Sequence, residues 1–184
     1  MAAPINSFKQ ALAEGNTLIG CWMSLAEGYT AEILGRAGFD WLLIDGEHSP
    51  NDIRSIRDQV VALASSNSNV VVRVPVGETW IIKQVLDLGA QTILVPIVET
   101  AEQARELVRA CSYPPDGTRG VGYGVSRAGG FGQFDGQGQG SIGQDRVQSQ
   151  IDKDIPVDCR QSSQLGEFDQ RGHGQGTGPI YKQV

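Results

Sequence analysis

Short, almost wholly apolar runs alternate with amphipathic segments along residues 1–113. The apolar runs cover residues 17–22, 41–45, 70–74 and 92–98. The segments after them begin near residues 29, 50, 79 and 101, and their apolar side chains recur at the spacing of one helical face. Strands without polar alternation are typical of parallel sheets that are covered on both faces. The pattern therefore predicts an α/β fold with four consecutive strand–helix units.

The composition of the chain changes at residue 129. Residues 129–184 are crowded with Gly and Gln, and their isolated apolar residues follow neither a strand nor a helix period. Such a segment cannot bury enough apolar surface to offset its chain entropy. We therefore divide the chain into an α/β domain, residues 1–128, and a low-complexity tail, residues 129–184. We expect the tail to be disordered or the product of a shifted reading frame.

Charge and cysteine usage narrow the class of protein. The formal net charge of −6 argues against a nucleic-acid partner, which would need a basic face. Cys21, Cys111 and Cys159 are an odd number without a C-x-x-C pair, which favours free thiols in a reducing compartment. No run approaches the roughly 20 apolar residues of a membrane helix, and the first ten residues lack a signal-peptide core. We expect a cytoplasmic protein without a membrane partner.

Reactive side chains follow three of the four predicted strands. The second strand ends in Asp45-Gly46-Glu47-His48, the third in Arg73, and the fourth near Glu99. In strand–helix architectures, functional groups collect where the strands end and the next loops begin. These strand ends are therefore the candidate active site.

His48 and Arg73 are the strongest candidates at this site. An imidazole titrates near neutrality, so His48 could act as a general base, although it could equally pack or cap the start of the next helix. The guanidinium of Arg73 interrupts an apolar strand, and its planar fork suits a carboxylate. That carboxylate could belong to a substrate or to an internal ion pair.

Four other residues have more than one interpretation each. Asp45 and Glu47 could orient His48, bind a metal through an outer shell, or only hydrogen-bond the turn at Gly46. Asp87 lies near the end of a predicted helix, where the helix dipole disfavours a carboxylate, so it could partner a histidine or remain solvated. Trp22 closes the first strand and could form a substrate wall or pack against its neighbours.

Four segments give the chain a dense resemblance to one known family. They are Asn6-Ser-Phe-Lys9, Trp41-Leu-Leu-Ile-Asp-Gly-Glu-His-Ser-Pro-Asn-Asp52, Ile82-Lys-Gln-Val-Leu-Asp-Leu-Gly-Ala-Gln-Thr92 and Tyr113-Pro-Pro-Asp-Gly-Thr-Arg-Gly-Val-Gly122. From about residue 6 to residue 128, the chain resembles the HpcH/HpaI aldolases, which are class II pyruvate aldolases. The resemblance implies the first half of a (β/α)-barrel of the TIM type and a homo-oligomer. It also implies an enzyme that uses Mg²⁺, Mn²⁺ or Co²⁺ to cleave 2-keto-hydroxy acids into pyruvate and an aldehyde.

The resemblance also assigns roles to individual residues. His48 resembles the general base of the family, and Asp87 resembles its partner. Arg73 resembles the arginine that binds the carboxylate and keto oxygen of pyruvate, and Trp22 resembles a residue of the substrate pocket. Asp45 and Glu47 lie in the same segment as His48, and we expect them to support the site.

The metal ligands that the resemblance implies have no counterpart in this chain. The family carries a Glu in a Gln-x-Glu motif and an Asp in a Gly-Pro-x-Asp-Leu motif, and neither motif occurs here. The segment Gly166-Glu-Phe-Asp169 follows no apolar run and does not replace them. We therefore expect that the chain lacks its own metal ligands and does not catalyse the cleavage on its own. The alternative is a non-catalytic half-barrel that binds a partner or pairs with another half-barrel.

Overall fold

The computed structural model describes residues 6–133. The strands are β1 (Gly20–Met23), β2 (Trp41–Asp45), β3 (Asn69–Arg73) and β4 (Thr92–Leu94). The helices are α1 (Ser7–Ala13), α2 (Gly28–Gly35), α3 (Ile53–Ala62), α4 (Thr79–Asp87) and α5 (Ala101–Cys111), with short 3₁₀ turns η1 (Leu63–Ser65) and η2 (Gly130–Gly132). Our predictions for Cys159, His173, Gly166–Asp169 and the rest of the tail beyond residue 133 lie outside the described residues.

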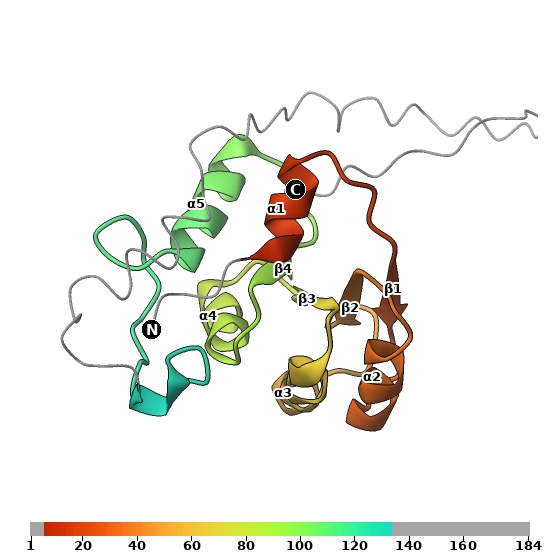
Figure 1. Cartoon of the computed structure of the whole chain (residues 1–184). Helices are drawn as coiled ribbons and strands as arrows, with labels where there is room; N and C mark the ends of the chain where they lie inside the picture. Colours follow the sequence, from red (N-terminus) through yellow and green to blue (C-terminus); the bar gives the residue numbers. More distant parts are fainter. Residues whose placement is uncertain (1–5, 134–184) are drawn as a thin grey trace, which may run out of the picture.

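The four strands form one parallel sheet in the order β1-β2-β3-β4. Each strand pairs with the next strand along the chain, and a helix follows each strand. This arrangement confirms the predicted α/β fold with four strand–helix units, the first half of a barrel of the TIM type. In Figure 1 the strands lie side by side, with α2 and α3 on one side and α1 on the other.

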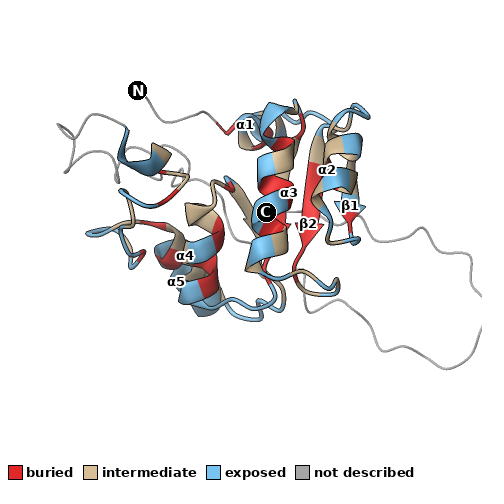
Figure 2. Cartoon of the chain, turned by 90° about the horizontal axis from the view of Figure 1, so that it is seen from below, coloured by how far each residue is buried: buried red, intermediate tan, exposed pale blue. Residues whose placement is uncertain are grey.

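Successive side chains along each strand point to opposite faces of the sheet, so the core consists of two clusters. Leu42, Ile44 and Val72 face the side covered by helices α2–α4 and belong to the larger cluster. Leu43 and Val71 face the opposite side and pack with Phe8 of α1. Figure 2 shows the buried faces of the covering helices turned toward the strands. Both faces of the sheet are therefore apolar, as the unbroken apolar runs predicted.

Helix α1 was not predicted from the sequence. Its N-cap Asn6 donates to the carbonyl of Gln91 over 3.2 Å, and Ser7 donates to Asn69 over 2.7 Å. Phe8 lies edge-on to Trp41, with ring centroids 6.4 Å apart. These contacts place α1 against the amino ends of the strands. The carboxyl ends on the same face are left to the polar side chains described below.

Three predicted boundaries are wrong. Strand β1 begins at Gly20 and not at residue 17. Helix α3 begins after the N-cap Asp52, whose carboxylate accepts from the backbone of Ser55, and not after Ser49. Strand β4 ends at Leu94 instead of residue 98, because its partner β3 ends at Arg73, which is opposite Leu94. Ile97 then takes a left-handed conformation (φ 55°), which an extended strand does not permit.

Two further predictions from the sequence concern free cysteine thiols and membrane-spanning helices. Cys21 and Cys111 are free thiols, and burial raises the pKa of the Cys111 thiol although Arg119 opposes the shift. Over residues 6–133, no helix combines the length and apolar character that crossing a bilayer requires.

Candidate active site

Strand geometry explains why three side chains that are distant in the sequence meet at the carboxyl ends of the strands. Asp45 and Arg73 are partners at the last position of the β2–β3 ladder, and Trp22 on β1 is the partner of Leu43 on β2. Leu43 and Asp45 share a face because they are two residues apart, and partners in parallel strands point the same way. Trp22, Asp45 and Arg73 therefore project from one face, at the carboxyl ends of the strands.

Asp45 and Arg73 form a two-pronged ion pair. Nε of Arg73 donates to Oδ1 of Asp45 and Nη2 donates to Oδ2, both over 2.8 Å. The Asp45 side chain is only 5% exposed and that of Arg73 16%. Such a fork fixes the plane of the guanidinium as well as its position.

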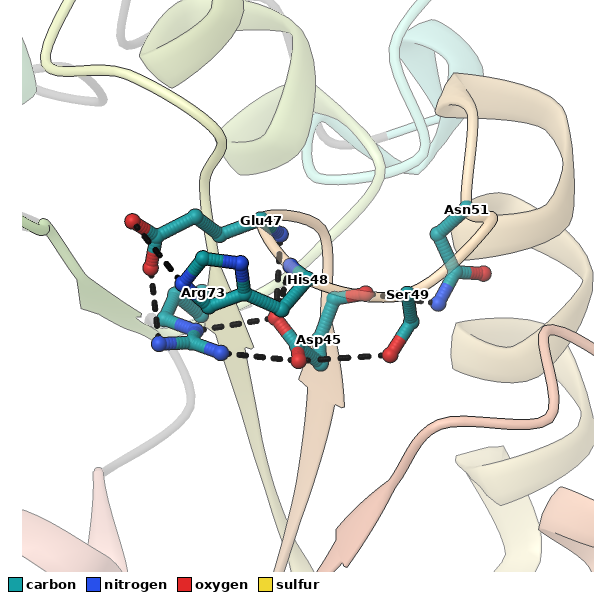
Figure 3. A network of polar contacts seen from close by, with 6 residues as sticks. All are labelled: Asp45, Glu47, His48, Ser49, Asn51 and Arg73. Carbon is teal, nitrogen blue, oxygen red and sulfur yellow. Dashed lines mark hydrogen bonds and ion pairs between the residues drawn. The ribbon is translucent and has the colours of Figure 1, made fainter.

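The Asp45 carboxylate also organises the turn after β2. It accepts from the backbone N–H of Glu47 over 2.9 Å and of His48 over 3.2 Å, and from Oγ of Ser49 over 3.2 Å. Figure 3 shows Asp45 between Arg73 and Ser49. Burial by itself raises the pKa of Asp45, but the hydrogen bonds from Arg73 and the two backbone N–H groups outweigh it and hold the pKa well below its usual range. Asp45 is therefore an anion at neutral pH, and it supports the site.

Glu47, His48 and Trp22 complete the cluster around Arg73. Nη1 of Arg73 lies 2.7 Å from Oε2 of Glu47, and the guanidinium carbon lies 4.6 Å from the centroid of the Trp22 ring. Nε2 of His48 lies 3.6 Å from Oε1 of Glu47, and the His48 side chain is 74% exposed. Contact with two carboxylates raises the pKa of Arg73, the hydrogen bonds to Asp45 being the largest cause. The structure thus brings together five of the six predicted site residues.

Gly46 is required by the close approach of this turn to β3. Its N–H donates to the carbonyl of Arg73 over 2.8 Å. A Cβ atom at Gly46 would lie only 2.6 Å from that carbonyl oxygen, closer than real Cβ contacts. The glycine therefore lets the turn rest directly on the strand that carries Arg73.

Asp87, the sixth predicted residue, is not beside His48. It is the last residue of α4, so it lies near the amino end of β4. Arg73 lies at the opposite, carboxyl end of the strands. The Asp87 carboxylate accepts from Nη2 of Arg119 over 2.7 Å. Arg119 is buried and stacks over Tyr113 at 4.6 Å. The positive charge of Arg119 offsets the unfavourable position of the Asp87 carboxylate at the C-terminal end of α4. That position had suggested a histidine partner.

Sequence reasoning missed three polar residues that hold the turn. Ser49 donates to the Asp45 carboxylate, and Asn51 donates to the Asp45 carbonyl over 2.8 Å. Gln59 donates to Asn51 from the buried face of α3. A signal for Gln59 was present, because it falls at helical spacing between the core residues Ile56 and Leu63.

The residues that the structure describes do not by themselves fit a divalent metal. No group of three His, Cys, Asp or Glu side chains among them is placed to hold one. Both carboxylate oxygens of Asp45 are engaged by Arg73, and Glu47 also contacts that cation. A metal ion bound beside Asp45 and Glu47 would need ligands from outside residues 6–133.

The fold and the site define a class of protein: a barrel-type α/β chain with an arginine–carboxylate cluster at the carboxyl ends of its strands. The chain belongs to the HpcH/HpaI aldolase/citrate lyase family, whose model matches residues 18–158. The match continues beyond residue 128, where the resemblance seen in the motifs ends. The family confirms the assignment made from the sequence.

Individual relatives agree with this family. The chain is 77% identical over 138 residues to a hydroxypyruvate/pyruvate aldolase of Roseobacter denitrificans, covering 75% of this chain and 54% of that protein. It is 52% identical over 130 residues to a 2-keto-3-deoxy-L-rhamnonate aldolase of Salmonella gallinarum, covering 71% and 49%. A solved HpcH/HpaI family structure from Burkholderia cenocepacia superimposes with a TM-score of 0.67 at 45% identity, covering 70% and 52%. The chain therefore spans about half the length of the relatives it matches.

Proposed function

We propose that the cluster around Arg73, formed with Trp22, Asp45, Glu47 and His48, is the keto-acid-binding part of a pyruvate aldolase site. The observation that carries the proposal is the rigid presentation of the guanidinium by Asp45, with Trp22 beside it and His48 at the surface. Arginine has five N–H donors. Asp45 takes two of them and Glu47 contacts a third nitrogen, so donors remain for the carboxylate and keto oxygen of a substrate.

The proposed reaction is retro-aldol cleavage of a 2-keto-4-hydroxy acid. His48 accepts the proton of the C4 hydroxyl, and that oxygen becomes the carbonyl oxygen of the leaving aldehyde. The electron pair of the broken C3–C4 bond stays with C3 and forms the enolate of pyruvate. A proton from the protonated His48 or from water then adds to C3 and gives pyruvate. Arg73 stabilises the enolate, because fixed positive charge placed in advance lowers the barrier to a developing anion. The relatives named hydroxypyruvate/pyruvate aldolases favour pyruvate or hydroxypyruvate as the keto acid.

A divalent cation, Mg²⁺, Mn²⁺ or Co²⁺, remains part of the proposal. Asp45 and Glu47 carry two negative charges against one positive charge on Arg73. An anionic keto acid adds a further negative charge, so a second cation would make its binding more favourable. Because residues 6–133 do not hold that cation on their own, we propose that this chain binds the keto acid far better than it turns it over.

A second candidate function is a non-catalytic half-barrel that pairs with another copy. Within residues 6–133, β1 and β4 each lack a neighbour on one side, and unpaired strand edges favour association. The family resemblance also favours a homo-oligomer. Light scattering of the purified chain separates a monomer from such an assembly.

The experiment that tests catalysis measures pyruvate released from 4-hydroxy-2-oxo acids, with each cation added and with EDTA. We expect very slow release, and binding of pyruvate detectable by calorimetry. His48→Ala should remove any cation-dependent release while leaving pyruvate binding nearly unchanged. His173→Ala is the matched control, because His173 is the other histidine of the chain. Failure of pyruvate and hydroxypyruvate to bind would contradict the proposal.

A further inference from the structure

A glutamine lies in the apolar interface between α3 and the sheet. Gln59 is 1% exposed, and its neighbours on the same helical face include the core residues Ile56 and Val60. A buried amide is costly unless its polar atoms are hydrogen-bonded. Nε2 of Gln59 donates to Oδ1 of Asn51 over 2.7 Å and to the carbonyl of Ser55 over 3.0 Å.

These hydrogen bonds determine which way the Asn51 amide lies. Oδ1 of Asn51 accepts from Nε2 of Gln59 and from Oγ of Ser55, each over 2.7 Å. Only the amide nitrogen is left to face the strand, and it donates to the backbone carbonyl of Asp45 over 2.8 Å. The reversed amide would place its oxygen against that carbonyl and its N–H₂ group against the Gln59 donor. Gln59 thereby selects one orientation of Asn51.

The turn that carries His48 is consequently held by two sets of contacts. The Asp45 side chain binds the N–H groups at the start of the turn, and Asn51 binds the Asp45 backbone from its end. The same Asp45 holds Arg73 through its two-pronged contact. A rotation of the Asp45 backbone would therefore move both the guanidinium and the imidazole.

We propose that Gln59 is a positioning residue for this site, acting through Asn51 and Asp45 on the plane of the Arg73 guanidinium. Its consequence for keto-acid binding rests on the proposed function. An apolar side chain of similar size, such as methionine, could fill the same space on α3. The specific contribution of the amide is therefore the orientation of Asn51 and not the packing of the helix.

The test is the Nε–H signal of Arg73 in nitrogen-15 NMR spectra of the full chain, which responds directly to the geometry of its bond to Asp45. We expect Gln59→Met and Asn51→Asp each to displace or broaden this signal. Asn51→Asp retains acceptors for Gln59 and Ser55 but loses the donor to Asp45. The matched control is Ser68→Ala, which removes the buried 2.6 Å hydrogen bond to the Phe39 carbonyl at the other edge of the sheet. It should leave the Arg73 signal in place.

A wild-type Arg73 signal in a folded Gln59→Met chain would overturn the proposal. If Gln59→Met does not fold, Asn51→Asp decides in the same way, because Asn51 is only partly buried. Pyruvate titrations should show binding weakened about three- to tenfold in both variants, the range expected for one hydrogen bond. If pyruvate does not bind the wild-type chain, the proposed function fails while the Arg73 signal still tests the positioning role.

Discussion

Asp45 and Arg73 face each other at the last position of the β2–β3 ladder, and two 2.8 Å hydrogen bonds join carboxylate to guanidinium. The pair connects two strands, and its carboxylate also holds the turn that carries Glu47 and His48. Because the same two side chains support the sheet edge and present the candidate site, stability and ligand binding should change together when either is altered.

Asp45→Asn should lower stability at neutral pH and flatten its acid dependence. Breaking one side of a mostly buried ion pair costs on the order of 2–4 kcal/mol. The pKa of Asp45 is lower in the folded chain than the unfolded value of about 4, although burial alone opposes this shift. The contribution of the carboxylate is therefore complete above about pH 5 and is lost as the pH falls below about 4 toward the folded pKa.

Urea titrations at two pH values measure this effect. Between about pH 5 and about pH 3, the free energy of unfolding of the wild-type chain should fall by about 1 kcal/mol more than that of Asp45→Asn. Asp58→Asn is the control, because Asp58 pairs with Arg57 in an exposed position. Identical pH profiles for the wild-type and Asp45→Asn chains would contradict the interpretation.

Arg73→Lys should separate charge from geometry. Lysine keeps the positive charge but loses the planar fork that binds two oxygens at once. We expect a folded chain whose affinity for pyruvate falls about tenfold or more, the loss of roughly one charge-assisted hydrogen bond. Calorimetric titration measures the affinity. Arg57→Lys, at an exposed arginine–carboxylate contact, should bind pyruvate as the wild type does.

Gly46→Ala should destabilise the edge of the sheet. The added methyl group would meet the Arg73 carbonyl at 2.6 Å, so either the turn or β3 must move. Overpacking of this kind typically costs about 1–3 kcal/mol. Denaturant unfolding measures the loss, and Gly124→Ala is the matched control because a Cβ atom there meets nothing within 4 Å. Equal stabilities of the two variants would show that the turn does not rest on β3.

Asp52→Ala should fray the start of α3. The Asp52 carboxylate accepts from the backbone N–H of Arg54 and Ser55, and Ser55 Oγ accepts from the backbone of Asp52. Loss of this capping box should accelerate hydrogen exchange at the amides of Arg54 and Ser55 and lower the thermal midpoint. Ser49→Ala should leave those two amides protected. Faster exchange of these amides in Ser49→Ala, and not in Asp52→Ala, would instead identify Ser49 as the cap of α3.

The sequence determined much of this protein without any tertiary information. Apolar runs separated by helical periods specified a parallel α/β sheet of four units, because strand and helix periods are local properties of the chain. The same runs placed Trp22, Asp45 and Arg73 at strand ends, and the strand register of the structure puts them on one face. Their convergence followed from the geometry that all parallel strands share.

Only the tertiary structure decided which partners these residues take. The Asp45–Arg73 pair joins residues 28 positions apart, and the Asp87–Arg119 pair joins residues 32 positions apart. No local pattern encodes such contacts, because they depend on how separate elements pack. For the same reason α1, the early end of β4 and the Gln59–Asn51 contact escaped prediction. The sequence indicated where reactive groups would gather, and packing decided that Asp45 would support Arg73 while Asp87 would pair elsewhere.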